Sequence, residues 1–380
     1  MSFLARYTRR NLLRRPGRTA LTLLGVAVAL FLLVCVESLS AGLDAALSGS
    51  DAARTLIVYR QNRYCPQTSF LPERYTAGIE RIPGVESVLP VKVFLNNCRA
   101  SLDLVTFQGA PVDKLFASRG VHVVAGSEQA FREGRDSALV GKAFADRRDL
   151  SPGDKFRLGN ITVNVAGIFE APERVEENLV LTHLDFLQRS GPVNRLGTVT
   201  QFEVKIQDPA QAREIARKID EQFKTAEEPT DTRPRIEFLE SATRDLKELL
   251  GFGRTFGLVS ALVVLVLVAN TVNMAVQERR KEFGICLAVG YEGRHLLRIV
   301  FVETLMLVIP AALLGIAAAW TVVFMSGISI GVEGVSVEFL VSPLVMLKGL
   351  LVALTLGLAA ASIPAFKASR EDPVAALRSA

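Results

Sequence analysis

Apolar residues are concentrated in four stretches of the chain, each as long as a membrane-spanning helix. A helix needs roughly 20 mostly apolar residues to cross the hydrocarbon layer of a bilayer. The four stretches are Thr19 to Ser40, Phe256 to Val276, Leu296 to Met325 and Pro343 to Phe366. The pattern therefore predicts an α-helical membrane protein with four transmembrane helices, and an even number of spans places both termini on one side.

The first apolar stretch could instead be a cleaved signal peptide, since Ser38 to Ala41 resembles a cleavage site. Its apolar run from Thr19 to Val36 is longer than a usual signal core, and the basic segment before it is long too. We expect the stretch to be retained as a span.

Between the first two spans lie about 200 residues in which short alternating patterns replace the long apolar runs, enough for one or two folded domains. Residues 85–95, 102–110, 155–170 and 198–208 alternate with the period of two that is typical of strands. Asp208 and Pro209 begin a helix that runs to Phe223, with Asp208 as its N-cap. We therefore expect a large α+β extracytoplasmic domain inserted between helices 1 and 2.

A second helix is predicted from Ser241, its N-cap, towards the second span. It could form a continuous stalk, or Gly251 and Gly253 could break it. The expected segments are 1–18 (basic amphipathic), 19–41 (span), 42–250 (domain and stalk), 251–277 (span), 278–295 (coupling segment), 296–325 (span), 326–342 (short outer loop), 343–366 (span) and 367–380 (tail).

The distribution of basic residues predicts how the spans are oriented. Arg residues crowd the first 18 positions, and Lys and Arg recur in the 277–298 loop and in the tail, whereas the 326–342 loop holds Glu333 and Glu338 without any Lys or Arg. By the positive-inside rule, both termini and the 277–298 loop are cytoplasmic. The net charge of +5 then reflects membrane orientation and attraction to lipid headgroups, and it does not indicate nucleic-acid binding.

Motifs for catalysis and nucleotide binding are absent. The one Gly-Lys pair, Gly141-Lys142, lacks the spacing of a phosphate-binding loop, and the three histidines lack metal-ligand spacing. We expect no catalytic residue, metal or cofactor in the chain. Cys65 and Cys98, both on the outer side, either form a disulfide or remain buried free thiols.

A short polar segment from Gln277 to Glu303 separates the second and third spans. From Glu282 it predicts a short amphipathic helix with Phe283, Cys286, Leu287 and Gly290 on one face, closed by Gly290 as C-cap. Such a helix lies on the bilayer, packs on its own protein or enters a groove of a partner. Because little cytoplasmic mass is predicted, we expect the bilayer or a partner.

This segment, ERRKEFGICLAVGYEGRHLLRIVFVETLML, resembles the signature of the FtsX/MacB-type ABC transporter permeases. RRNLLRRPGRTALTLLGVAVAL near the start, LVGKAFADRRDLSPGDKFRLGNITVNVAGIFE in the outer region and the ending PAFKASREDPVAALR agree with that family in order. The resemblance implies a MacB-like periplasmic core domain, a permease dimer and a coupling helix that docks on a cytoplasmic ATP-binding subunit.

By this resemblance, Phe283, Leu287 and Val289 would contact the ATP-binding subunit, with Arg279, Arg280 and Glu282 at the rim. The expected docking segment comprises Arg279, Arg280, Glu282, Phe283, Cys286, Leu287, Val289 and Gly290. Leu287 departs from the family, where Arg or Lys is common, which leaves the polar contacts and the identity of the ATPase open.

Two ionisable residues, Glu303 and Lys348, fall within the spans near their ends, where both can reach an interface. Glu303 matches a family glutamate and either pairs with Arg298 or Arg294 or is solvated. Small residues in span one (Gly25, Ala29) and span three (Gly315, Ala319) either allow close helix contact or face lipid.

The sequence thus predicts a multi-pass permease subunit of the bacterial inner membrane, without ATPase motifs of its own. ATP hydrolysis by a separate subunit would move the outer domain for export or extraction of a lipid, lipoprotein, peptide or drug. The expected partners are that ATPase, a second permease copy or paralogue, membrane lipids, and a periplasmic adaptor or substrate-binding protein. A non-transporting regulator that activates a cell-wall hydrolase, or signals from its outer domain, is the alternative.

Overall fold

The computed structural model describes residues 14–47, 52–63, 68–95, 105–173, 175–326, 329–332 and 335–370. The chain divides into two compact units. The first, here called the helical unit, comprises residues 1–40, 249–326 and 339–380; the second, the sheet domain, comprises 41–248 and 327–338.

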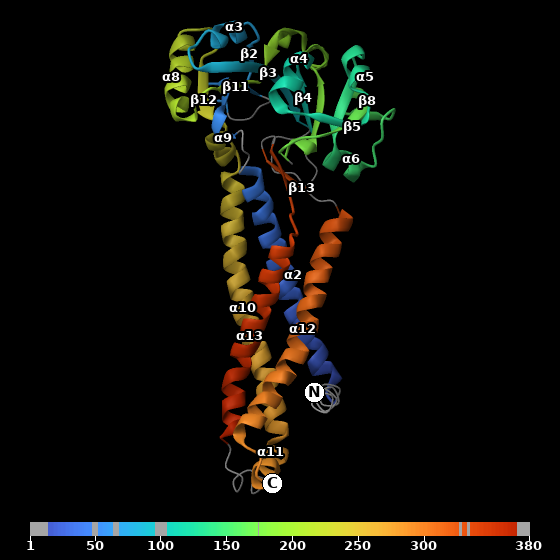
Figure 1. Cartoon of the computed structure of the whole chain (residues 1–380), viewed down its shortest axis with the longest axis vertical. Helices are drawn as coiled ribbons and strands as arrows, with labels where there is room; N and C mark the ends of the chain where they lie inside the picture. The colour runs from blue at the N-terminus through green and yellow to red at the C-terminus, as the bar shows by residue number, and fades with distance from the viewer. Residues whose placement is uncertain are drawn as a thin grey trace. The chain divides into compact units, whose positions relative to one another are not determined.

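In the described part of the helical unit there are four long helices, and all four are long and apolar enough to cross a membrane. They are α2 (Pro16–Leu47), α10 (Arg244–Glu278), α12 (Gly293–Ser326) and α13 (Pro343–Ser369) (Figure 1). Each is longer than the apolar stretch that predicted it, because the helix continues into polar flanks that hydropathy alone does not mark as helical. Of the two alternatives for the stalk at Gly251 and Gly253, the structure shows the continuous one, since both glycines lie inside α10.

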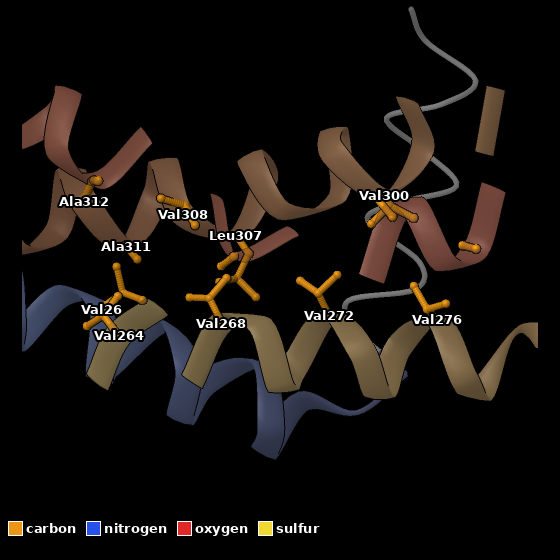
Figure 2. Close-up of a cluster of buried hydrophobic side chains, with 14 of the residues drawn as sticks. Val26, Val264, Val268, Val272, Val276, Val300, Leu307, Val308, Ala311 and Ala312 are labelled. Atoms are coloured by element: carbon orange, nitrogen blue, oxygen red, sulfur yellow. The ribbon is translucent and has the colours of Figure 1, made fainter. Parts of the chain in front are cut away.

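The helices of this unit pack through a core of valine, leucine and alanine. Figure 2 shows Val264, Val268 and Val272 of α10 facing residues of α12 such as Leu307 and Val300. Val26 and Leu30 of α2 and Ala353 and Ala360 of α13 belong to the same core.

Glycines allow two helix pairs to approach to backbone contact. A Cβ atom on Gly315 of α12 would lie 2.4 Å from the carbonyl oxygen of Ala27 in α2, and one on Gly293 would lie 2.4 Å from that of Ser369 in α13. Gly25 is also in contact, since a Cβ there would lie 2.9 Å from Leu267. Of the two alternatives for Gly25 and Gly315, the structure shows contact with neighbouring helices.

The sheet domain is built on one ten-stranded sheet in the order β12-β1-β11-β3-β4-β9-β6-β8-β5, with β7 beside β8. Most neighbours are antiparallel, and β4–β9 and β6–β8 are parallel. The strands are β1 (Thr55–Arg60), β3 (Val85–Leu95), β4 (Thr106–Ala110), β5 (His122–Gly126), β6 (Ser137–Gly141), β7 (Lys155–Leu158), β8 (Ile161–Glu170), β9 (Leu179–His183), β11 (Gln201–Ile206) and β12 (Thr230–Pro234), with the separate pair β2 (Leu71–Pro72) and β10 (Thr198–Val199).

Strand β3 connects the two halves of this sheet. Its first part, Val85 to Val91, pairs with β11, and its last part, Lys92 to Leu95, pairs with β4. Each half has its own apolar core, and β3 contributes side chains to both cores. Its pairing with β11 and with β4 therefore fixes the alignment of the two halves. The strands predicted at 85–95, 155–170 and 198–208 are present, and each of the last two is divided into two strands. Of the strand predicted at 102–110, residues Thr106–Ala110 form β4, and residues 102–104 lie outside the described part.

Short helices cover the sheet (Figure 1). They are α3 (Tyr75–Glu80), α4 (Val112–Arg119), α5 (Glu128–Glu133), α6 (Lys142–Arg148), α7 (Leu184–Arg189), α8 (Ala212–Phe223) and α9 (Arg235–Ala242). Helix α8 buries Ile215, Ile219 and Phe223 as its sequence predicts. The Asp208 carboxylate accepts from the backbone N–H of Ala210 (2.9 Å), so Asp208 is a cap, although the first turn is a 3₁₀ helix over Pro209–Gln211.

Two expectations for the segments beside the spans need correction. Ser241 is not an N-cap, because it lies within α9 and its hydroxyl donates to the carbonyl of Phe238 (2.8 Å); the helices instead divide at Thr243. The expected loop 326–342 contains a hairpin, β13 (Ser329–Val332) and β14 (Val335–Glu338), and Glu338 pairs with Arg147 of α6 at 2.8 Å.

We predict opposite effects of an added methyl group at two glycines of the helical unit. Gly315→Ala should destabilise the unit by about 1–3 kcal/mol, because the methyl overlaps the Ala27 carbonyl. Gly257→Ala, where no atom lies within 4 Å of the new Cβ, should be neutral or up to about 1 kcal/mol stabilising. Denaturant titration in detergent measures both, and equal effects would contradict the role of close contact at Gly315.

Candidate functional site

The segment between α10 and α12 folds as a separate short helix, α11 (Arg280–Ala288). It ends in a glycine-dependent turn: Gly290 has φ +99°, its N–H donates to the carbonyl of Leu287 (3.1 Å), and the N–H of Tyr291 donates to that of Cys286 (3.0 Å). This is the pattern of a Schellman motif, in which only glycine adopts the left-handed position without strain. The predicted role of Gly290 in closing the helix is confirmed.

The apolar face predicted for this helix packs on the protein itself. The Phe283 side chain is buried in the core of the four long helices, and Cys286 and Leu287 pack against the same core. The expectation that this face lies on the bilayer or enters a partner's groove is therefore corrected, whereas a contact of Phe283 with an ATP-binding subunit stays a prediction. The ends of the spans supply the packing surface that the sequence did not reveal.

Another face of α11 and its C-terminal turn expose apolar side chains. Ile285 is 53% exposed, Val289 74% and Tyr291 58%. Arg280 and Lys281 are exposed near the start of the same helix. This surface, comprising Ile285, Val289 and Tyr291, is here called the α11 surface. Val289 belongs to the predicted docking segment, and Ile285 and Tyr291 do not.

Beside α11, Arg279 and Glu303 form a buried ion pair. Arg279 is the residue between α10 and α11, Glu303 lies in α12, and both are under 9% exposed. A guanidinium N–H of Arg279 donates to the Glu303 carboxylate, and the guanidinium lies 5.1 Å from the centre of the Phe283 ring. Arg279 is thus not at an exposed rim, and Glu303 pairs with Arg279 instead of Arg298, Arg294 or solvent.

In the sheet domain, a charged cavity of about 150 Å³ lies where residues of both sheet halves meet. Arg119 of α4 donates to Glu203 of β11 (2.6 Å), and Arg235 of α9 pairs with Glu173 (2.9 Å) and Glu176 (3.2 Å). Burial alone would raise the pKa of Glu203, but the nearby Arg119 and Arg235 guanidiniums lower it overall. The cavity is far below the roughly 300 Å³ or more of sites for drug-sized ligands. Sequence reasoning missed this cluster, because its members are distant in sequence.

A second cluster in the sheet domain places two cations on one aromatic ring. The guanidinium of Arg195 lies 3.9 Å from the centre of the Phe70 ring, and the ammonium of Lys92 lies 5.0 Å from it. Lys92 is buried and donates to the hydroxyl of Thr198 (3.0 Å). Burial, and then the charge of Arg195, lower the pKa of Lys92 to about 8.

The remaining predicted residues take no part in these clusters. Lys348 is exposed on α13. Cys65 and Cys98 lie outside the described residues, so their pairing stays a prediction, as does the amphipathic helix before Arg14. Within the described ranges, no group of three or more His, Cys, Asp or Glu residues could hold a metal ion.

Comparison with known sequence families assigns both parts of the chain. Residues 19–222 match the MacB-like periplasmic core domain, and residues 254–373 match the FtsX-like permease C-terminal domain. The first match alone covers more than half of the chain. The chain belongs to the FtsX/MacB-type ABC transporter permeases.

Two relatives of this permease agree with the assignment. It is 23% identical over 95% of its length to the macrolide export ATP-binding/permease protein MacB of Vibrio parahaemolyticus, and 25% identical over 95% to the pyoverdine export ATP-binding/permease protein PvdT of Pseudomonas syringae pv. tomato. It spans 57% of the length of both relatives. The periplasmic region of MacB from Actinobacillus actinomycetemcomitans aligns over 50% of this chain and 92% of that structure, with 11% identity and a TM-score of 0.37.

We predict that Glu303→Ala will destabilise the helical unit of the permease by about 3–5 kcal/mol, because it leaves the buried Arg279 charge without its carboxylate. Replacing both partners by apolar residues, Arg279→Met with Glu303→Leu, should restore most of the loss. Glu292→Ala, which removes an exposed partner of Arg294, should cost less than about 1 kcal/mol. Unfolding in detergent measures all three, and a double variant as unstable as Glu303→Ala would show that charge burial is not the cause.

We also predict that Lys92 makes the free energy of unfolding of the permease change with pH in the alkaline range. Its lowered pKa means that the unfolded chain binds more protons between pH of about 8 and 10.4, so stability should rise with pH across this window. In calorimetry, the stability advantage of Lys92→Met over the wild type should therefore be largest near pH 7 and shrink towards pH 10. The exposed Lys218→Met is the control, and wild-type and Lys92→Met profiles that run parallel would contradict the prediction.

Proposed function

We propose that this permease transmits ATP hydrolysis by a cytoplasmic ABC subunit to its sheet domain, and that this motion drives export across the bacterial inner membrane. The observation that carries the proposal is α11: a short helix held by buried contacts to the spans, with apolar residues exposed on its other face. Partner docking accounts for both properties, because a docked helix must expose a binding surface and be held firmly enough to pass on a displacement.

The contacts of α11 support transmission to more than one span. Phe283 enters the core shared by the long helices, and Arg279 joins the end of α10 to α12 through Glu303. A force on α11 would reach α10 and α12 together. In this proposal Ile285 and Val289 contact the ATP-binding subunit, with Arg280 and Lys281 beside them.

The relatives support export as the direction of transport. MacB and PvdT are named for the export of macrolides and pyoverdine, and both names join ATP-binding and permease functions in one protein. For this chain we propose a cargo among lipids, lipoproteins, peptides and drugs, and a dimer of permeases. The proposal puts both termini and α11 in the cytoplasm, and the sheet domain outside, between the first two spans and available to a periplasmic adaptor.

Affinity purification of the tagged permease from its native membrane tests the proposal. An ATP-binding subunit should be recovered with the permease in mild detergent, and the complex should hydrolyse ATP. Recovery of the permease alone in several detergents, with no ATP hydrolysis, would refute the coupling role of α11.

We predict that Val289→Asp and Ile285→Asp each reduce recovery of the ATP-binding subunit more than ten-fold, because a charge would be buried in an apolar contact. Val193→Asp is a matched control, since Val193 is 82% exposed in the sheet domain and is remote from α11 in sequence. All three variants should unfold like the wild type. Equal recovery from Val289→Asp and Val193→Asp would exclude the α11 surface as the docking site.

A further inference from the structure

A narrow groove in the helical unit is charged at one end and mostly apolar along the rest, where Thr271 and Thr304 add hydroxyl groups to the lining. The charged end is formed by Arg14, which precedes α2, by Arg18 in the first turn of α2 and by Glu278 at the end of α10. The apolar part is formed by Val268, Val272 and Leu307. From Val268 to Glu278 the groove follows ten residues of α10, about 15 Å at 1.5 Å per residue. This is about half of the roughly 30 Å hydrocarbon thickness, the depth of one leaflet.

Among the residues that the structure describes, the ion pairs at the polar end involve more guanidinium groups than carboxylates. Arg15 and Arg18 both pair with Glu278 (3.3 and 3.1 Å), and Arg14 pairs with Glu282 of α11 (3.4 Å). Together with the Arg279–Glu303 pair in the groove wall, four guanidinium groups meet three carboxylates. An anionic ligand group would suit this predominantly basic set.

Arg18 also has one side-chain hydrogen-bond donor that is left unsatisfied among the described residues. Its terminal nitrogens face Glu278, but its Nε is buried and has no hydrogen-bond partner within the described part of the chain. A buried donor without an acceptor is unfavourable, and a ligand oxygen at this position would remove that cost.

The enclosed part of the groove, about 60 Å³, is too small for a drug-sized molecule. It suits a ligand that places only a small anionic group between the helices and leaves its apolar remainder along the valines. We propose that this groove binds an anionic phospholipid of the leaflet on the α11 side, with the phosphate at Arg14 and Arg18 and an acyl chain along Val268, Val272 and Leu307.

Occupancy of the groove would also act on α11, a consequence that rests on the proposed coupling function. A phosphate at Arg14 and Arg18 competes with Glu282 and Glu278 for the same guanidiniums, and Glu282 belongs to α11. Bound lipid would therefore loosen the connection between the start of α2 and α11.

Lipid binding by the purified full-length permease in detergent tests the proposal without reference to ATP hydrolysis. Phosphatidylglycerol should bind at least ten-fold more tightly than phosphatidylcholine, measured by native mass spectrometry during lipid titration. Arg14→Gln with Arg18→Gln should reduce this affinity about ten-fold. Arg294→Gln with Arg298→Gln removes the same charge from exposed positions at the start of α12 and should change it less than two-fold.

Three results would overturn the proposal. An equal loss of phosphatidylglycerol affinity in the two double variants would indicate that the lipid is attracted to basic residues in general. Equal affinities for phosphatidylglycerol and phosphatidylcholine would indicate adventitious lipid binding. Displacement of the lipid by millimolar inorganic phosphate would indicate a site for the free ion.

If the first double variant does not fold, Arg18→Lys keeps the charge but removes the Nε donor and should still weaken phosphatidylglycerol binding several-fold. This experiment measures lipid binding and not ATP hydrolysis. A negative result would therefore overturn the lipid site without bearing on the proposed coupling to an ATP-binding subunit.

Discussion

The buried ion pair between Arg279 and Glu303 is the interaction on which the arrangement around α11 depends. Removing two charges from water costs several kcal/mol per ion, so such a pair persists only where its partners satisfy each other closely. Here the carboxylate comes from within the third span and the guanidinium from the residue at which the second span ends. The pair therefore sets where α10 stops relative to α12, and the Phe283 ring beside it directs α11 into the helical core.

Close packing between helix backbones provides the second constraint on the helical unit. In lipid, burial of apolar side chains does not by itself drive helices together, because lipid tails are equally apolar. Backbone contacts at Gly315 and Gly293 supply the dispersion contacts that remain. Helices held together by a buried ion pair and by close backbone packing are suited to transmitting displacement. Packed helices shift between discrete arrangements more readily than they deform.

The sheet domain combines a continuous backbone with charged contacts between its halves. Strand β3 crosses from one half to the other, while the Arg119–Glu203 pair and the contacts of Arg235 with Glu173 and Glu176 join α4, β11, α9 and the segment before β9. Arg235 is the first residue of α9, the last short helix before α10 in the chain. The two halves are thus tied together close to the point where the chain leaves the domain.

The sequence by itself determined the elements whose signals are local. Long apolar runs marked the four helices, period-two alternation marked β3 and β8, and Asp208 and Gly290 marked helix ends, because length, alternation and capping depend on neighbouring residues. The family signature located the segment that folds as α11 in the same way. Only the tertiary structure decided which face of α11 is buried, that Glu303 pairs with Arg279, that Arg119 meets Glu203, and that Arg14 and Arg18 border a groove. These contacts join residues up to hundreds of positions apart, and no local pattern encodes which of several chemically equivalent partners the packed helices and strands bring within reach.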